Sequence, residues 1–298
     1  MSIVNYHSSP LSISIKGAGT ALVTPFTADG AVDIKALGEL VEYNISNGID
    51  FLCILGTTAE TATLSTAEQA QVRMTLVSRI EGRVPVLLGF GGNDTGHMAA
   101  RLKRESFAGV DALLIVTPYY NKPSQEGLYR HYRALSEASP LPIVLYNVPS
   151  RTGVNMQAET TLRLARDCRN IVGIKEASGN IEQISAILAG RPRGFRVLSG
   201  DDKLTLQLMR LGADGVISVV ANEHPAAITD LVHSAKDRDY AAAEAIDARL
   251  APCYDLLFRE GNPTGIKALL SLRGRCCNVL RLPLVPATDA LLADLRQL

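Results

Sequence analysis

The chain has 298 residues, of which 47% are hydrophobic and 20% charged, and its thirty basic residues balance thirty acidic ones. This is an ordinary globular composition, and the balanced charge excludes recognition of nucleic acid or anionic lipid through surplus basic charge. No apolar run approaches the roughly 20 residues needed to span a bilayer. From the charge balance the sequence predicts no nucleic-acid partner, and from the short apolar runs it predicts no membrane partner.

Residues 1–16 form an N-terminal segment without the basic start and long apolar stretch of a signal peptide. The five cysteines include no C-x-x-C pair, which argues against a redox motif. We therefore expect a reduced, cytoplasmic protein.

Short apolar runs rich in β-branched residues recur along the chain and predict strands. There are eight of them, at residues 18–26, 49–56, 84–90, 110–118, 142–149, 171–177, 195–200 and 214–220. Segments between them, such as 33–48, 65–82 and 124–138, space their apolar residues three and four apart, as amphipathic helices do.

Strands that are apolar on both faces and alternate with helices indicate a parallel sheet covered by helices. Eight is the number of strands that closes a (β/α)8 TIM barrel. The competing fold is a doubly wound open sheet, but the stretch GAGTAL after Lys16 lacks the third glycine of its phosphate-binding fingerprint. The sequence favours the barrel.

After Val220 the pattern becomes wholly helical. Helical segments are predicted at 224–237, 239–258, 262–274 and 288–298. We assign residues 17–225 to the barrel core and residues 226–298 to the last barrel helix and a C-terminal helical extension, all within a single domain.

Active sites of such barrels lie at the C-terminal ends of the strands. The polar or functional residues that fall there, strand by strand, are Thr57, Thr58, Glu60, Tyr119, Tyr120, Tyr146, Arg151, Lys175, Gly200, Asp201, Asp202 and Ile217.

Lys175 is the most informative of these residues, because it directly follows the apolar residues of a buried strand. An ammonium there costs several kcal/mol unless it is paired or loses its proton. Pairing with Glu176 is disfavoured because consecutive strand residues project to opposite sides. A neutral lysine amine attacks carbonyl groups to form a Schiff base, so we interpret Lys175 as the nucleophile.

Other polar residues have structural explanations. Asp201 and Asp202 resemble metal ligands, but neighbouring residues point apart and the histidines are scattered, so we expect capping roles and no metal. Glu60 could act as an acid or base, although stabilisation of a helix start is the simpler account.

Schiff-base chemistry needs a proton shuttle, which a tyrosine bonded to a threonine hydroxyl can supply. Backbone amides around Thr57 and Thr58, at a predicted helix start, suit the carboxylate of the substrate. Arg151 offers a bidentate guanidinium for a second acidic substrate. These residues predict a lysine-dependent aldolase or condensing enzyme that acts on small keto acids.

The motifs GTTAETATL, TPYYNKPSQEGLYRHY, YNVPSRTG, GIKEASGN, SGDD and GVISVVAN occur in this order from Gly17 onward. Together they resemble the dihydrodipicolinate synthase family. The resemblance implies condensation of pyruvate with L-aspartate-4-semialdehyde in lysine and diaminopimelate biosynthesis, with no cofactor beyond the covalent Schiff base on Lys175. It also implies a homo-oligomer, a tetramer built from two dimers.

The resemblance assigns roles to single residues. Lys175 forms the Schiff base, and Tyr146, Thr57 and Tyr120 form the proton relay, with Tyr120 reaching into the neighbouring subunit. Substrate-binding roles fall to Thr58 for the carboxylate of pyruvate, Arg151 for that of the semialdehyde, and the backbones of Gly200 and Ile217.

Two alternatives remain open. Another class I pyruvate-dependent aldolase would keep Lys175 and Tyr146 but would not need Arg151. A catalytically silent ligand-binding barrel would have no reason to keep the relay. Thr66, Gln69 and His97 also differ from one lysine-regulated pattern of the family, which predicts weak or absent inhibition by lysine.

Overall fold

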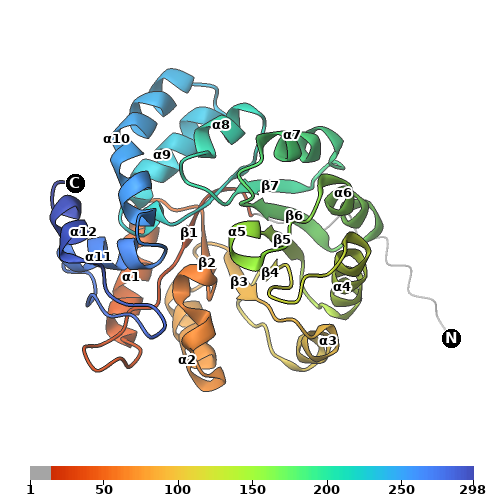
Figure 1. The fold of residues 1–298 in the computed structure, drawn as a ribbon, viewed down its shortest axis with the longest axis horizontal. Helices are drawn as coiled ribbons and strands as arrows, with labels where there is room; N and C mark the ends of the chain where they lie inside the picture. Colours follow the sequence, from red (N-terminus) through yellow and green to blue (C-terminus); the bar gives the residue numbers. More distant parts are fainter. Residues whose placement is uncertain (1–14) are drawn as a thin grey trace.

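The computed structural model describes residues 15–298, so most of the expected N-terminal segment lies outside the described residues. Eight parallel strands pair in chain order, and β1 pairs with both β2 and β8 to close a barrel (Figure 1). The strands are β1 Gly17–Ala21, β2 Phe51–Ile54, β3 Val86–Phe90, β4 Ala112–Val116, β5 Ile143–Asn147, β6 Ile171–Glu176, β7 Arg196–Ser199 and β8 Gly215–Ser218. The predicted barrel is confirmed, and the open sheet is excluded.

Closure of the barrel depends on a glycine pair. Gly17 of β1 lies opposite Gly215 of β8, and a Cβ atom on Gly215 would lie 1.9 Å from the carbonyl oxygen of Gly17. Gly215 also has a φ of +151°, which other residues rarely adopt. The two strands can therefore approach because neither residue has a side chain.

Helices surround the barrel and begin where the sequence predicts caps. Those after successive strands are α1 Ile34–Ser46, α2 Thr66–Ile80, α3 Thr95–Arg104, α4 Gln125–Ala138, α6 Ala158–Asp167, α7 Ile181–Gly190, α8 Thr205–Arg210 and α9 Pro225–Lys236, with a short α5 Pro149–Thr152 before α6. The side chains of Asp33, Ser65 and Ser124 each accept a hydrogen bond from a first-turn backbone N–H of α1, α2 and α4.

The hydrophobic core has two layers. The larger one lies between strands and helices, and the smaller one fills the barrel interior. The interior layer includes Phe51, Cys53, Tyr146, Leu198 and Ile217. Because the interior is packed with side chains, substrates can enter only at an end of the barrel.

The C-terminal extension consists of α10 Tyr240–Phe258, α11 Thr264–Leu272 and α12 Asp289–Leu295, as the sequence predicts. Helix α10 packs on α8 and α9, and α11 packs on the 3₁₀ turn η3 Val220–Asn222 that follows β8. Figure 1 shows the extension at one side of the ring, beside α1. It therefore lies next to the loops that follow β1, β2 and β8.

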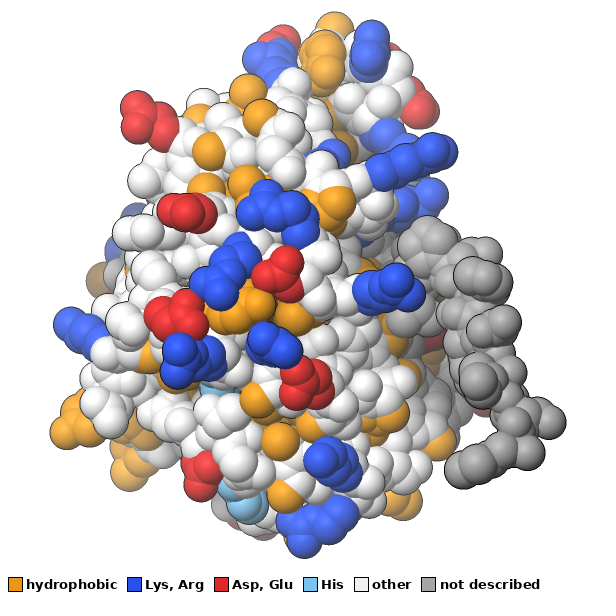
Figure 2. Space-filling model, turned by 90° about the vertical axis from the view of Figure 1, so that its right-hand side faces the viewer, with side chains coloured by type: hydrophobic (Ala, Val, Ile, Leu, Met, Phe, Trp, Pro, Cys, Tyr) orange, Lys and Arg blue, Asp and Glu red, His pale blue; other side chains and the backbone are white. Residues whose placement is uncertain are grey.

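The face formed by α4 and α6 carries charges of both signs side by side (Figure 2). Arg130 and Arg163 both bind Glu126, and Arg133 binds Glu137. Basic and acidic groups are thus interspersed on this face. Within residues 15–298, no helix is both long enough and apolar enough to cross a membrane.

Candidate active site

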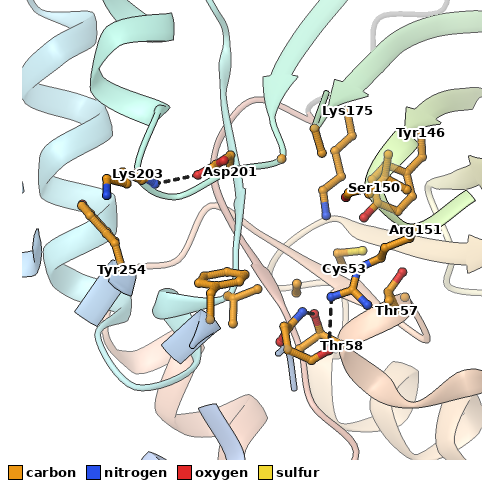
Figure 3. Close-up of a pocket in the computed structure, with 18 of the residues that line it drawn as sticks. Cys53, Thr57, Thr58, Tyr146, Ser150, Arg151, Lys175, Asp201, Lys203 and Tyr254 are labelled. Carbon is orange, nitrogen blue, oxygen red and sulfur yellow. Dashed lines mark hydrogen bonds between the residues drawn. The ribbon is translucent and has the colours of Figure 1, made fainter. Parts of the chain in front are cut away.

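A cavity of about 430 Å³ opens at the C-terminal ends of the strands (Figure 3). Its lining residues come from strands β1, β2, β4, β5 and β6, from the loops after β2, β5, β6, β7 and β8, and from α10 and the segment after it. They are Ala21, Cys53, Gly56, Thr57, Thr58, Leu114, Tyr146, Val148, Ser150, Arg151, Lys175, Ala177, Gly200, Asp201, Lys203, Val219, Tyr254, Asp255, Phe258, Arg259 and Asn262. Most of the residues predicted from strand ends are therefore brought together in one cavity.

Lys175 projects from β6 into this cavity and is only 6% exposed. Tyr146 is its partner in the register of β5 and β6, and Nζ of Lys175 lies 4.5 Å from the centroid of the Tyr146 ring. Among residues 15–298, no carboxylate pairs with this amine. The aromatic face provides a weak cation–π contact, which does not replace a counter-ion.

Glu176, the next residue, lies on the outer side of the strand. Its buried carboxylate accepts hydrogen bonds from the side chains of Asn147 and Gln183 and from the backbone N–H of Ser178, at 2.8–3.1 Å. Burial raises the pKa of Glu176, and these donors oppose the shift. The alternation of strand side chains therefore separates Glu176 from Lys175, as the sequence predicted.

Gly200, after β7, packs directly against the lysine stem. A Cβ atom at this position would lie 2.7 Å from Cβ of Ala177 and 3.0 Å from Cε of Lys175. The absence of a side chain at Gly200 therefore leaves room for the extended lysine.

The three residues of the predicted relay are only partly brought together. Tyr146 and Thr57 both line the cavity, but no hydrogen bond joins them in the described part of the chain. Tyr120 is 92% exposed, with a left-handed φ of +66°, and lies outside the cavity. A single chain therefore does not contain a closed relay.

Thr58 and Arg151 are joined by a residue of the C-terminal extension. The side chain of Asn262 donates a hydrogen bond to Oγ1 of Thr58 at 2.8 Å, and its backbone carbonyl accepts one from Arg151 at 3.2 Å. Figure 3 shows Arg151 and Thr58 near each other at the cavity wall. Asn262 was not predicted as a site residue, because in the sequence it stands only at the start of a predicted helical segment.

Ile217 does not line the cavity. It is 1% exposed and packs within the barrel interior. It lies on β8, and the lining residue contributed by the chain just after this strand is Val219.

The two aspartates after β7 accept hydrogen bonds from backbone N–H groups, which agrees with the predicted capping roles. Asp202 is buried and accepts hydrogen bonds from the N–H groups of Val219 and Val220 after β8, and Asp201 accepts one from the N–H of Lys203. In residues 15–298, no group of three or more histidine, cysteine or acidic side chains could hold a metal ion.

The expectation that Glu60 stabilises a helix start is wrong. Its buried carboxylate forms an ion pair with Lys267 of α11 at 2.6 Å, and it faces away from the cavity. Glu60 and Lys267 are 207 residues apart in the chain. A contact between such distant residues leaves no local pattern in the sequence, so this pairing could not be predicted.

The arrangement suits covalent capture of a small keto acid. A buried amine without a counter-ion faces a tyrosine ring, and the cavity wall offers a threonine hydroxyl, turn amides and a guanidinium to carboxylates. The thiol of Cys53 also lines the cavity, but burial raises its pKa to about 11, so it is a poor nucleophile.

Comparison with known proteins agrees with this chemistry. The profile of the dihydrodipicolinate synthetase family matches residues 14–298. A 4-hydroxy-tetrahydrodipicolinate synthase of Parabacteroides distasonis is 52% identical over 92% of both chains, and one of Phocaeicola vulgatus is 53% identical over 91% of this chain and 92% of that one.

Solved structures show the same relationship. Dihydrodipicolinate synthase from Thermotoga maritima superposes with a TM-score of 0.93 at 41% identity, over 96% of this chain and 97% of that one. The chloride-inhibited enzyme from Acinetobacter baumannii, solved in complex with pyruvate, superposes with a TM-score of 0.92 at 42% identity, over 95% and 97% of the two chains.

Proposed function

Because this chain belongs to the dihydrodipicolinate synthase family and condenses pyruvate with L-aspartate-4-semialdehyde, we propose that Lys175 carries the reaction as a Schiff-base nucleophile. The chain is a lyase of lysine and diaminopimelate biosynthesis. The observation that carries the proposal is the buried amine of Lys175, which faces the cavity without a counter-ion.

The proposed reaction begins when Nζ of Lys175 attacks the keto carbon of pyruvate. Loss of water from the resulting carbinolamine gives an imine, and loss of a methyl proton gives an enamine. The enamine carbon bonds to the aldehyde carbon of the second substrate, whose oxygen takes up a proton. The amino group of that substrate then attacks the imine carbon, and departure of Lys175 releases the cyclic product, 4-hydroxy-tetrahydrodipicolinate.

Tyr146 is the proposed proton carrier, because its ring packs against the lysine amine. Thr57, which lines the same wall, would complete the relay when substrate binds, since catalytic hydrogen bonds often tighten only in the complex. Tyr120 would reach the relay of a second copy. Its 92% exposure, beside a Tyr119 that is 44% exposed, supports contact with another subunit. We propose that these tyrosines lie at a contact between two subunits, within the tetramer of two dimers that the family resemblance implies.

The two substrate carboxylates would bind at neighbouring places. The hydroxyl of Thr58 and the amides of Thr57 and Thr58, at the start of the turn η1 Thr57–Ala59, would receive pyruvate, and the backbones of Gly200 and Ile217 would border it. Arg151, an exposed guanidinium at the cavity wall, would bind the carboxylate of the semialdehyde. Replacement of Arg151 by methionine should then raise the KM for the semialdehyde about tenfold or more and leave that for pyruvate unchanged.

The comparisons favour the synthase over another class I aldolase, since every relative described above is a synthase. A silent barrel is disfavoured because the amine, the tyrosine and the guanidinium all face one cavity. The covalent bond to Lys175 would replace a dissociable cofactor. All five cysteines are free, which supports a reducing, cytoplasmic location.

The test is reduction by borohydride in the presence of pyruvate, followed by mass spectrometry of the intact protein. The parent protein and a Lys203→Met control should each gain one reduced pyruvate, and Lys175→Met should gain none. Lys203 is a fair control because it lines the same cavity but is exposed and paired with Asp255. An unmodified parent protein, or an adduct that persists in Lys175→Met, would contradict the proposal.

A further inference from the structure

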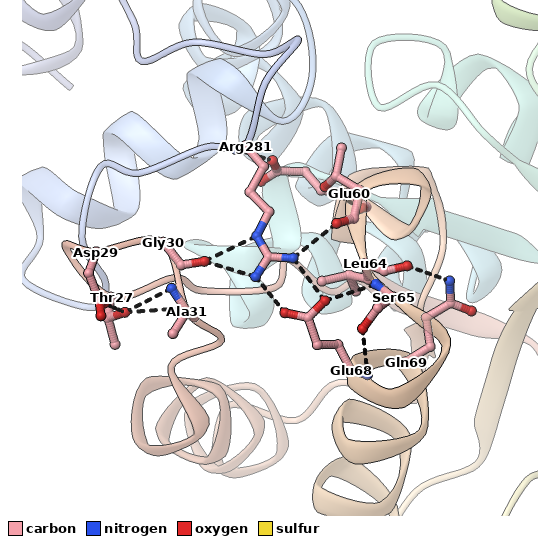
Figure 4. A network of polar contacts seen from close by, with 11 residues as sticks. Thr27, Asp29, Gly30, Ala31, Glu60, Leu64, Ser65, Glu68, Gln69 and Arg281 are labelled. Atoms are coloured by element: carbon pink, nitrogen blue, oxygen red, sulfur yellow. Dashed lines mark hydrogen bonds and ion pairs between the residues drawn. The ribbon is translucent and has the colours of Figure 1, made fainter.

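A buried ion pair joins the turn after β2 to the C-terminal extension. Nζ of Lys267 lies 2.6 Å from Oε1 of Glu60, and both side chains are fully buried. The second carboxylate oxygen of Glu60 accepts a hydrogen bond from the backbone N–H of Arg281 at 3.0 Å (Figure 4). Both carboxylate oxygens of Glu60 are therefore held by residues of the extension.

Glu60 is also part of the turn whose amides we propose to bind the carboxylate of pyruvate. It directly follows η1, and its N–H donates to the carbonyl of Thr57 at 3.1 Å. Its φ of +53° is left-handed, a conformation that residues other than glycine keep only where their surroundings hold it. The ion pair and the hydrogen bond of the Glu60 carboxylate therefore hold the backbone of Glu60 in this conformation, and this backbone orients the η1 amides.

Arg281 holds the same turn from a second side. Its guanidinium binds the carboxylate of Glu68, in the first turn of α2, and the backbone carbonyl of Thr63 at 2.9 Å (Figure 4). Lys267 and Arg281 also lie 4.0 and 4.6 Å from the centroid of the Phe26 ring. The segment from η1 to the start of α2 is thus attached to the extension through two cations.

Stability alone does not account for a charge pair at this position. Buried ion pairs are often replaceable by apolar residues without loss of stability, because desolvation offsets their attraction. Their attested use is to select one geometry among several. At this position the geometry selected is that of η1, which lines the cavity through Thr57 and Thr58.

We propose that Glu60 and Lys267 are positioning residues for pyruvate. Their ion pair holds η1 so that its amides and Thr58 receive the substrate carboxylate, and the extension thereby sets the affinity of a site whose nucleophile lies on the barrel. The proposal rests on the function proposed above. It predicts an effect on carboxylate recognition, whereas the chemistry of Lys175 remains intact.

The test compares Lys267→Met with Arg275→Met, which removes a cation from the same extension. Arg275 binds Glu223 at 2.7 Å and stacks on Tyr43, away from η1. For each variant, borohydride trapping is measured against the concentration of pyruvate and of methyl pyruvate, which lacks the carboxylate. Thermal melting monitors the fold.

Lys267→Met should need about tenfold more pyruvate than the parent for half-maximal trapping, because the loss of one charge-assisted hydrogen bond weakens binding by about that factor. Methyl pyruvate should be trapped as in the parent. Arg275→Met should match the parent with both ketones. Lys267→Arg, which keeps the charge, should restore most of the affinity for pyruvate. Equal half-saturation of Lys267→Met and the parent by pyruvate would overturn the proposal, as would equal losses for both ketones.

The double variant Glu60→Gln/Lys267→Met avoids an unpaired buried charge and serves if the single variant does not fold. Weakened trapping of pyruvate alone supports positioning, and parent-like trapping overturns it. Failure of the proposed function gives a different result, because the parent protein itself would then form no adduct with pyruvate.

Discussion

Replacement of Gly200 by alanine should disable the site while leaving the barrel folded. The backbone of Gly200 is not in the left-handed region, so alanine fits its conformation. The added methyl group would lie 2.7 Å from Cβ of Ala177, 3.0 Å from Cε of Lys175 and 3.1 Å from the carbonyl oxygen of Glu176. Non-bonded carbons normally stay about 3.5–4.0 Å apart, so the two carbon contacts are short by about 0.5–1.3 Å.

Something must move to relieve this overlap. The Cβ of Ala177 and the carbonyl of Glu176 are attached directly to the backbone where β6 ends, whereas the end of the Lys175 side chain is flexible and faces a cavity. We therefore expect the lysine to shift by about 0.5–1 Å, and a misplacement of about 1 Å costs about a hundredfold in rate. Overpacking should cost the fold only about 1–3 kcal/mol.

The assay is condensation of pyruvate with L-aspartate-4-semialdehyde, coupled to a reductase that oxidises NADPH. Gly200→Ala should lower kcat about a hundredfold and slow borohydride trapping, with a melting temperature only a few degrees below the parent. Gly96→Ala in α3 is the matched control, since its methyl group would come no closer than 3.4 Å to Asp94. Unchanged kcat in Gly200→Ala would refute the argument that this glycine makes room for the lysine.

Three further outcomes follow from other contacts. Asn262→Ala removes the donor to Thr58 and should raise the KM for pyruvate about threefold to tenfold. The KM for the semialdehyde should stay unchanged, because Arg151 binds the backbone carbonyl of residue 262, which alanine keeps. A raised KM for the semialdehyde with an unchanged KM for pyruvate would contradict this prediction. Burial lowers the pKa of His131 from 6.5 to about 4 in the folded protein. As pH drops from 6.5 to 4 the unfolded chain therefore takes up a proton that the folded chain does not. The free energy of unfolding should fall by up to roughly 3 kcal/mol over this range. His131→Gln should flatten this part of the curve of melting temperature against pH, and parallel curves would exclude the effect. Lysine should inhibit weakly or not at all, since His97 stands where one lysine-regulated pattern of the family has an acidic residue, and half-inhibition below millimolar lysine would show otherwise.

The features that the sequence predicted correctly depend on local pattern. Alternating strands and helices identify the barrel, and strand periodicity places Lys175 inside it and Glu176 outside. Because every strand of a parallel barrel ends at the same rim, Thr58, Tyr146 and Arg151 could be grouped without knowledge of the helices that separate them.

The features that could not be predicted depend on contacts between distant segments. Asn262 and Lys267 lie in a helical segment whose sequence shows only amphipathic spacing, and its docking onto the turn after β2 is a property of the whole fold. The exposed position of Tyr120 is a different case, because its predicted partner would be another subunit.

The docking of the extension also bears on the order in which this protein folds. The contact between Thr58 and Asn262 spans 204 residues, and the pair between Glu60 and Lys267 spans 207. Contacts of such long range form late, because the entropy of closing a large loop must be overcome first. During synthesis, β1 can pair with β8 once Ser218 has been made, but the turn after β2 stays without its partners until α11 has followed. Until then the barrel would hold its reactive lysine in place but would bind pyruvate more weakly than the finished chain does.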